Sequence, residues 1–246
     1  MPPWRWPAVL THRCGGRLAP ENSLAGLCRA AALGIRGVEF DAMLAACGTP
    51  VVIHDETLDR TTEASGPVAG RSWAELAQVR LRDAEGRLSA EHLPSLEQIF
   101  RCCARLGLAA NVEIKPSAGQ DIETGREVAR QVARLCRIHP VPVLLSSFSS
   151  TALDAARTSA PSLSRGHLFA QLPIDACERA TALGCQALIV DKDVVDAAAI
   201  DVARRAGLSV GVYTENHPGH ALQLRRLGVA GVITDRPDTL GPLLVP

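Results

Sequence analysis

Two carboxylates, Glu39 and Asp41, stand one residue apart in an otherwise apolar segment, residues 37–41. In a strand, side chains two residues apart point to the same face, so these acids would emerge side by side with Val38 and Phe40 packed behind them. Burying two carboxylates together is unfavourable unless something neutralises them. A bound cation is the simplest candidate for that partner. The alternative is an edge strand whose acids are solvated.

Polar side chains also follow the other apolar segments, at the points where we expect strands to end. A third carboxylate, Glu113, stands two residues before Lys115, so these two side chains would share a face. Polar residues gathered at one end of several strands are what a functional site requires. The other segments end in His12-Arg13, His54-Asp55, Ser146-Ser147-Phe148, Tyr213-Thr214-Glu215-Asn216 and Thr234-Asp235-Arg236.

The residue types in this set indicate phosphate chemistry. Glu39, Asp41 and Glu113 would supply three carboxylates from two neighbouring strands. Ligation by oxygen alone suits a hard cation, Mg²⁺ or Ca²⁺, better than zinc. Arg13 and Lys115 add positive charge at the same rim. Acids that hold a metal, together with bases that face an anion, describe a site for a phosphate ester.

Two histidines complete the candidate site. His12 and His54 could act as an acid–base pair, one at the attacking oxygen and the other at the leaving group. They could instead be metal ligands, although three carboxylates already provide oxygen ligands. One histidine at a strand end is more often structural than catalytic, but two that flank a carboxylate cluster favour the catalytic interpretation.

The elements that would position these residues follow a recurrent order of helix, Leu-Gly or Ala-Gly turn and apolar strand. Glycine just past a helix is the usual left-handed terminator, and strands that alternate with helices indicate a parallel sheet covered by helices. Eight strands in 246 residues predict a (β/α)8 barrel of the TIM type, whose active site lies at the carboxyl ends of the strands. The strands are predicted at Val9, Val38, Val112, Leu144, residues 167–169, Leu188, Val210 and Val232.

Two segments interrupt this order. Residues 50–53 follow the second strand too closely for a crossover helix, so we expect them to fold back as a hairpin. Residues from about 56 to 93 are polar and irregular, and they predict an insertion in a single barrel domain of residues 1–246. One helix, at about 72–79, is expected there, and so long an excursion is more often functional than idle. We expect the insertion to cap the site and to help select the substrate.

The local signals for helix ends are clear at several points. Asn22 or Ser23 is the predicted N-cap of the first helix. Ser95 and Gln98 form a capping-box pattern before a helix that ends near Gly107. Two tryptophans, Trp4 and Trp6, precede the first strand, and they either line the rim of the site or cover the opposite end of the barrel.

Composition excludes several function classes. The chain is 47% hydrophobic and 21% charged, as is usual for a globular protein, and its 26 basic and 26 acidic residues give no electrostatic case for nucleic acid or an anionic membrane. No apolar run approaches the roughly 18 residues of a membrane span, and the N-terminus lacks a signal-peptide pattern. We therefore expect a cytoplasmic protein without membrane insertion. The eight cysteines are irregularly spaced without a CxxC pair, which predicts reduced thiols.

Taken together, these motifs resemble the glycerophosphodiester phosphodiesterase family. The resemblance covers essentially the whole chain, and segments 18–22, 111–116 and 145–148 look like the short cytosolic bacterial type. The motifs that follow the family's order and spacing are His12-Arg13 with Pro20-Glu21-Asn22-Ser23, Glu39-x-Asp41, His54-Asp55, Glu113-x-Lys115 and Tyr213-Thr214.

The resemblance implies an activity and a set of roles. Such enzymes are TIM-like barrels that use one divalent cation, Mg²⁺ or Ca²⁺, to hydrolyse glycerophosphocholine, glycerophosphoethanolamine and similar diesters in glycerophospholipid breakdown. The products are sn-glycerol 3-phosphate and an alcohol, and the glycerol 2-hydroxyl can attack phosphorus to give a cyclic phosphate that water opens. The implied roles are metal ligation by Glu39, Asp41 and Glu113, acid–base catalysis by His12 and His54, phosphate binding by Arg13 and Lys115, and support of the first loop and of Arg13 by Glu21.

Two positions depart from the family pattern. Cys14 stands where the family usually has Gly after His-Arg, and Cys47 stands where it commonly has Asp before the hairpin Gly. If Cys14 keeps a glycine-like positive φ, its Cβ costs about 1 kcal/mol. It would also place a thiol near the phosphate site. Neither change touches a metal ligand or a histidine, so we expect activity to survive.

Three alternatives stay open at this point. The same barrel and metal could act on lysophospholipids or sugar phosphodiesters, but a lipid enzyme is expected to expose an apolar loop, whereas the insertion here is charged and polar. A catalytically silent binding barrel has no physical need for buried like charges. A Schiff-base aldolase built on Lys115 is disfavoured, because a lysine beside Glu113 should stay protonated. The head group, the native metal and the oligomeric state are left undetermined.

Overall fold

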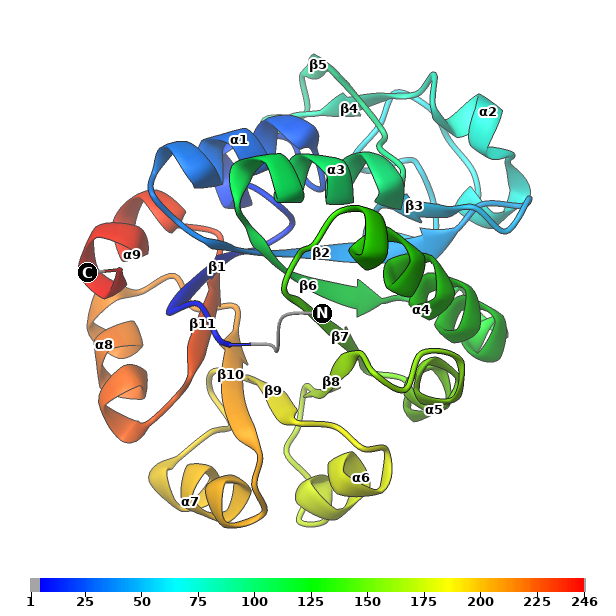
Figure 1. Cartoon of the computed structure of the whole chain (residues 1–246). Coiled ribbons are helices and arrows are strands. Elements are labelled where there is room, and N and C mark those ends of the chain that lie inside the picture. The colour runs from blue at the N-terminus through cyan, green and yellow to red at the C-terminus, as the bar shows by residue number, and fades with distance from the viewer. Residues whose placement is uncertain (1–4, 246) are drawn as a thin grey trace.

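A closed barrel of parallel strands forms the centre of the structure (Figure 1). The computed structural model describes residues 5–245, so Trp4 lies outside the described residues. The strands neighbour one another in the order β1-β11-β10-β9-β8-β7-β6-β2, and pairing of β1 with β2 closes the barrel. The predicted (β/α)8 architecture is confirmed. The barrel strands are β1 Val9–Thr11, β2 Gly37–Leu44, β6 Ala109–Ile114, β7 Val143–Ser147, β8 Ser164–Phe169, β9 Ala187–Asp191, β10 Ser209–Tyr213 and β11 Gly231–Thr234.

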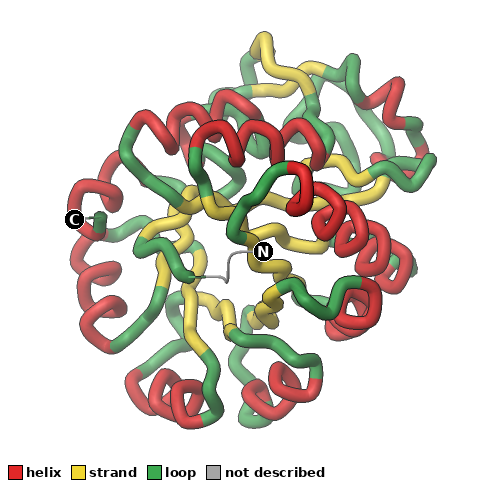
Figure 2. The backbone as a smooth tube through the Cα atoms, in the orientation of Figure 1, coloured by secondary structure: helices red, strands yellow, loops and turns green. Residues whose placement is uncertain are grey.

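Helices form a ring around these strands (Figure 2). Each long helix turns an apolar stripe toward the barrel, and α3 buries Leu96, Ile99, Phe100 and Cys103 at the spacing of one helical face. The predicted capping box of Ser95 starts this helix. The helices of the ring are α1 Leu24–Ala32, α3 Leu96–Leu106, α4 Asp121–Ile138, α5 Ser150–Ser159, α6 Ala176–Ala182, α7 Ala197–Arg205, α8 Pro218–Leu227 and α9 Pro237–Leu244.

The amino end of the barrel is closed by Trp6. Its indole Nε1 donates a hydrogen bond to Ser209 Oγ at 2.8 Å. Gly211 and Gly231 make room for the ring, because a Cβ at either position would lie 2.4–2.5 Å from indole carbons. Of the two placements expected for Trp6, the structure therefore has the one that covers the end opposite the site.

The hairpin and the insertion follow β2. Strand β3, Pro50–Val52, pairs antiparallel with β2, which confirms the predicted hairpin. Residues 56–93 lie outside the helix ring and pack on an apolar cluster of their own that includes Leu58, Leu76 and Leu81 (Figure 1). The elements of this insertion are η2 Val68–Gly70, α2 Trp73–Leu76, β4 Arg80–Arg82 and β5 Leu88–His92.

The predicted helix of the insertion is shorter than expected. We expected residues 72–79, but α2 covers only Trp73–Leu76. A Ser72–Glu75 capping box starts the helix, but Leu81 must then reach the apolar cluster, and the chain does this by pairing β4 with β5. This hairpin was not predicted, because β5 is exposed at alternate positions and carries no buried apolar run.

Two expectations from composition can be compared with the structure. All eight cysteines are unpaired, and Cys28, Cys102, Cys136 and Cys177 lie in helices as expected. None of the helices within the described part of the chain is long and apolar enough to cross a membrane.

Candidate active site

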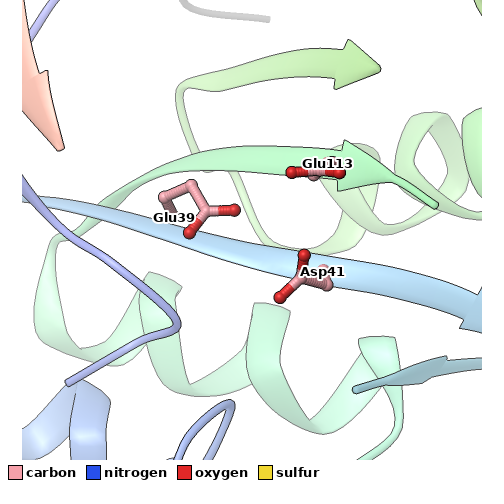
Figure 3. Close-up of side chains that lie close together, drawn as sticks. All are labelled: Glu39, Asp41 and Glu113. Carbon is pink, nitrogen blue, oxygen red and sulfur yellow. The ribbon is translucent and has the colours of Figure 1, made fainter. Parts of the chain in front are cut away.

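Three carboxylates converge toward the carboxyl ends of β2 and β6 (Figure 3). Glu39 and Asp41 lie on β2 and Glu113 lies on β6, where Asp41 is the register partner of Glu113. Ligand oxygens of the three acids lie within 4.8 Å of one another. Glu39 and Asp41 are almost fully buried, with 3% and 1% exposure. The fold therefore brings together the three acids that the strand spacing predicted.

This cluster carries more negative charge than the protein alone readily accommodates. Burial and the neighbouring Asp41 raise the pKa of Glu39 to about 7 and raise that of Glu113 well above its usual value. Burial also pushes the pKa of Asp41 upward, but His54 and Lys115 outweigh it and hold that pKa below its usual value. A hard divalent cation would supply the missing positive charge. The all-oxygen donor set therefore fits Mg²⁺ or Ca²⁺.

Two cationic side chains approach the carboxylates without forming close ion pairs. Lys115 Nζ lies 3.7 Å from Asp41 Oδ1 and 3.7 Å from Glu113 Oε1. Arg13 Nε lies 3.9 Å from Asp41 Oδ2, is buried, and has no hydrogen-bond partner within residues 5–245. Both side chains therefore have donor hydrogens that an oxygen of a bound phosphate can accept.

Each of the two histidines is paired with a carboxylate through Nδ1. His12 Nδ1 lies 2.7 Å from Asp235 Oδ1, and His54 Nδ1 lies 2.6 Å from Asp55 Oδ1. We assign the Nδ1 hydrogen to each ring, because the ionised carboxylate can only accept. Nε2 is then the nitrogen that exchanges protons. His54 Nε2 accepts a hydrogen bond from Lys115 Nζ at 2.6 Å.

The two imidazoles differ in proton affinity. Burial lowers the pKa of His12, but the hydrogen bond to Asp235 and the charge of Glu39 outweigh it, so the pKa is raised. Burial also lowers the pKa of His54, and there the shift stays downward because two cations oppose Asp41 and Asp55. Opposite shifts of this kind are what an acid–base pair needs near neutral pH.

A residue of the insertion ties these groups together. Arg13 Nη1 donates to Glu21 Oε2 at 2.6 Å, so the expected contact between these two residues is present. Arg60 Nη1 donates to Glu21 Oε1 at 2.6 Å, and Arg60 Nε donates to Asp55 Oδ2 at 2.6 Å. The carboxylate behind His54 and the loop that carries Arg13 are therefore held by one guanidinium from residues 56–93.

These side chains surround a cavity of about 210 Å³ at the mouth of the barrel. Its polar wall is formed by the two histidines, two of the acids and the two cations described above. Phe148 and Tyr213 form part of the apolar wall, where their rings meet edge to face at a centroid distance of 5.8 Å. A metal site, phosphate donors and proton carriers around one small cavity can together cleave a phosphate ester.

Comparison with known proteins supports this chemistry. A model of the "Glycerophosphoryl diester phosphodiesterase family" matches residues 12–239. The chain belongs to the glycerophosphoryl diester phosphodiesterase family. Assignment to this family of hydrolases, predicted from the motifs, is confirmed, and so is its assignment as an enzyme.

Named relatives of the family align over almost the full chain. A glycerophosphodiester phosphodiesterase of Caldanaerobacter subterraneus is 28% identical over 94% of this chain and 95% of its own. The structure of an Oleispira antarctica phosphodiesterase in complex with the product sn-glycerol-3-phosphate has a TM-score of 0.87 and 31% identity, covering 96% of both chains. A putative family member from Silicibacter pomeroyi has a TM-score of 0.85 and 25% identity over 100% of this chain and 94% of that one.

The structure places the predicted site residues of this family member in one region. Six of them line the cavity, Asp41 lies against Lys115 beside it, and Glu21 holds Arg13 from the next loop. The predicted residues that line the cavity are His12, Arg13, Glu39, His54, Glu113 and Lys115.

Four residues around the site received no catalytic or binding role from the sequence. Asn22 was considered only as an N-cap, and the N-cap of α1 is Ser23. Asn22 donates from Nδ2 to Asp41 Oδ2 at 2.9 Å, and Asn111 lines the cavity with both amide atoms buried and unpartnered within the described chain. Asn111 stands two residues before Glu113, so the alternation of the strand could have identified it. Asp235 stands at a predicted strand end, but nothing local pairs it with His12. No local sequence pattern around Arg60 predicts a role in the site.

Cys14, one of the two departures from the family pattern, adopts φ 71°, so the positive φ suited to glycine is retained. Its thiol does not line the cavity, although it lies close enough to Glu39 and Asp41 for their charges to add to the effect of burial on its pKa. Cys14 is fully buried in the core cluster between the barrel and α1 and α3, and burial raises its pKa well above the usual value. Cys47 is exposed in the turn between β2 and β3.

Proposed function

We propose that this protein hydrolyses small soluble glycerophosphodiesters, such as glycerophosphocholine and glycerophosphoethanolamine, to sn-glycerol 3-phosphate and an alcohol, and that it needs one divalent cation. The observation that carries the proposal is the grouping of three buried carboxylates with two histidine–carboxylate pairs around one cavity. The complex of the Oleispira antarctica relative with its product, sn-glycerol-3-phosphate, supports the substrate class.

Glu39, Asp41 and Glu113 would hold the cation. When bound, Mg²⁺ or Ca²⁺ supplies positive charge that polarises the phosphate and lowers the energy of its developing charge. The acids are preoriented without it, because the backbone amide of Arg13 donates to Glu39 Oε2 at 3.0 Å and Asn22 holds Asp41. The lowered pKa of Asp41 keeps one ligand ionised, and the raised pKa of Glu39 reflects an ionised form with too little positive charge around it. A bound cation would interact favourably with both carboxylates.

Arg13 and Lys115 bind the phosphate from the protein side. The unpartnered Arg13 Nε and the Lys115 ammonium each offer a hydrogen to a phosphate oxygen. Glu21 fixes the Arg13 guanidinium, so little side-chain freedom is lost when the substrate binds. Asn111 faces the same cavity with a free donor and a free acceptor, which suits a glycerol hydroxyl.

The two histidines move protons at Nε2. In the first step one imidazole accepts the proton of the glycerol 2-hydroxyl as this oxygen attacks phosphorus. The other imidazole gives a proton to the departing alcohol oxygen, which leaves a cyclic phosphate. Water then opens the ring with the proton transfers reversed, so each histidine returns to its starting state. Asp235 and Asp55 keep the rings oriented through both steps.

The test is release of sn-glycerol 3-phosphate from glycerophosphocholine and glycerophosphoethanolamine with added Mg²⁺ or Ca²⁺, and with EDTA. We expect release that EDTA abolishes and that added metal restores. His12→Asn and Glu113→Gln should abolish it, whereas Glu123→Gln, at an exposed site on α4, should not. No release with either head group and either metal would contradict the proposal. Lysophospholipids and sugar phosphodiesters are the comparison substrates in this test. A lysophospholipid is expected to be the poorer substrate, because the insertion is charged and not apolar.

Two further properties stay predictions that we carry into this proposal. A cytoplasmic location agrees with eight unpaired cysteines, because an oxidising compartment favours disulfides. A single domain over residues 1–246 agrees with the family match over residues 12–239.

A further inference from the structure

A second cavity, of about 510 Å³, adjoins the catalytic cavity. It lies between the loop after β1 and the insertion, whose turn between β4 and β5 contributes to its wall. His12 and Arg13 line both cavities, so a ligand held at Arg13 can extend from one into the other. Glu91 on β5 accepts a hydrogen bond from the Ala25 amide at 2.9 Å, which anchors the hairpin to the start of α1.

The acidic side chains of this cavity are matched by cations. Glu21 accepts hydrogen bonds from Arg13 and Arg60, both at 2.6 Å. Asp83 accepts from Arg87 of the same hairpin at 2.8 Å, and Arg87 is not part of the lining. Asp235, the third acid, follows β11, and its carboxylate pairs with His12 after β1. Glu21 and Asp83 are therefore compensated by arginines, whereas Asp235 is compensated only when His12 is protonated. The lining still carries four arginines against three carboxylates.

Two arginines of the lining have no such partner. Arg17 is exposed, and its guanidinium donates to no residue within the described part of the chain. Arg82 donates only to backbone carbonyls there, to Thr62 O at 2.8 Å and Gly86 O at 2.9 Å. The cavity therefore has an excess of positive charge in its lining. Guanidinium groups in this state are suited to bidentate binding of a phosphate or phosphodiester.

The lining is unsuited to a quaternary ammonium group. Such cations are bound by aromatic rings, and no aromatic side chain is among the described residues that line this cavity. A groove on the far side of Lys115 does carry Glu56, Asp121 and the exposed ring of Phe148, but no histidine lines it. Because the leaving oxygen must take its proton from a histidine, the cavity that shares His12 is the better place for the alcohol half.

On the basis of the function proposed above, we propose that this cavity binds the alcohol half of the substrate and selects alcohol halves that bear a second phosphate or phosphodiester. We call it the arginine subsite, defined by Arg17 and Arg82. The preferred substrates are then diesters with negative charge on both sides of the scissile bond, and the leaving alcohol departs as an anion-bearing polyol.

The test compares two substrates that differ only in this charge, glycerophosphoglycerol phosphate and glycerophosphoglycerol, with glycerophosphocholine as the cationic reference. We expect kcat/KM for the phosphate-bearing substrate to be about tenfold above that for the neutral one, and Arg17→Gln to remove most of this preference, because one charge-assisted hydrogen bond is lost. Arg29→Gln is the matched control, because Arg29 is exposed on α1 and lines neither cavity. It should leave the ratio unchanged.

Arg82→Gln is the second variant, and its melting temperature must be compared first because Arg82 binds two backbone carbonyls. Equal kcat/KM for the charged and neutral substrates, a preference for glycerophosphocholine, or an unchanged ratio in Arg17→Gln would overturn the arginine subsite. A preference for choline would move the alcohol half to the groove beside Phe148. Failure of the proposed function would look different, because none of the three diesters would be hydrolysed.

Discussion

Arg60 holds both carboxylate oxygens of Asp55, with Nε at 2.6 Å from Oδ2 and Nη2 at 3.0 Å from Oδ1. Asp55 in turn fixes the His54 ring. An arginine of the insertion therefore positions a proton carrier of the barrel. The insertion, expected to cap the site and to help select the substrate, also contacts the His54–Asp55 pair through Arg60.

We predict that Arg60→Gln lowers kcat by about tenfold on a diester with a neutral alcohol half, because Asp55 loses its bidentate partner and no longer fixes the His54 tautomer. The melting temperature should change little, since Arg60 is half exposed. Arg80→Gln is the control, because it breaks an exposed ion pair with Glu63 in the same insertion. Equal kcat values for Arg60→Gln and the unaltered protein would show that the bridge has no catalytic importance.

A second prediction concerns the pH dependence of kcat/KM. Asp235 raises the pKa of His12 through its hydrogen bond and charge, so Asp235→Asn should lower that pKa. One limb of the pH–rate profile should therefore move to lower pH by about one unit. Whether the acidic or the alkaline limb moves will identify His12 as base or acid. Asp238→Asn, which alters an exposed partner of Arg236, should leave both limbs in place. A profile unchanged in Asp235→Asn would contradict the proton-carrying role of His12.

Metal binding should be measurable as thermal stability. A cation at about 100 times its Kd stabilises the folded state by about 2.7 kcal/mol, which corresponds to a rise of roughly 5–10 °C in a domain of this size. Glu113→Gln should abolish the rise, because it removes one of three ligands, while leaving the metal-free protein at least as stable by removing a buried charge. Glu123→Gln should keep the full rise. The metal cluster would be refuted by an equal rise in all three proteins.

A fourth prediction is that replacing Asn111 lowers the activity without lowering the stability. Its amide is buried and has no hydrogen-bond partner in the described structure, so Asn111→Ala removes an unsatisfied polar group and should not lower the melting temperature. It should lower kcat/KM by about tenfold if the amide binds a glycerol hydroxyl. Asn216→Ala is the contrast, since Asn216 bonds Thr234 and Asp235 and its loss should destabilise the protein. A fall in stability without a fall in activity would assign Asn111 a structural role only.

A fifth prediction concerns acid stability and a histidine outside the site. His167 on β8 is 2% exposed, and burial lowers its pKa to about 4 from the usual 6.5. Above pH 6.5 the ring is neutral in both states. Below it the unfolded chain binds the proton first, so stability is lost as the pH falls from 6.5 toward 4, by about 2–3 kcal/mol in all. His167→Gln should flatten this part of the stability curve measured with urea. His92→Gln, at an exposed position, should follow the unaltered protein.

Part of the site follows from local periodicity. A strand sends alternate side chains to one face, so the pairing of Glu39 with Asp41 and of Glu113 with Lys115 could be read without knowing the fold. Eight repeats of strand and helix then imply a closed barrel, and a closed barrel brings strand ends together. Strand spacing and the repeats were enough for the fold and for seven candidate residues, and the family resemblance added Glu21.

Other features depend on chain segments that meet only after folding. His12 and Asp235 are 223 residues apart and become neighbours because β1 closes the barrel against β11. Arg60 reaches Glu21 across 39 residues because the insertion folds back over the loop after β1. Cys14 turns into the core because the backbone has a positive φ at this residue, and no neighbouring residue type in the sequence predicts that φ.

The sequence by itself predicted the barrel and the grouping of three carboxylates, two histidines and two cations at one site, because each depends on spacing along one strand or on the order of strands. The tertiary structure alone decided that Asp235 orients His12, where Arg60 acts and which arginines have no carboxylate partner within the described chain. Those relationships are set by distances between segments remote in the chain, and such distances have no local pattern in the sequence.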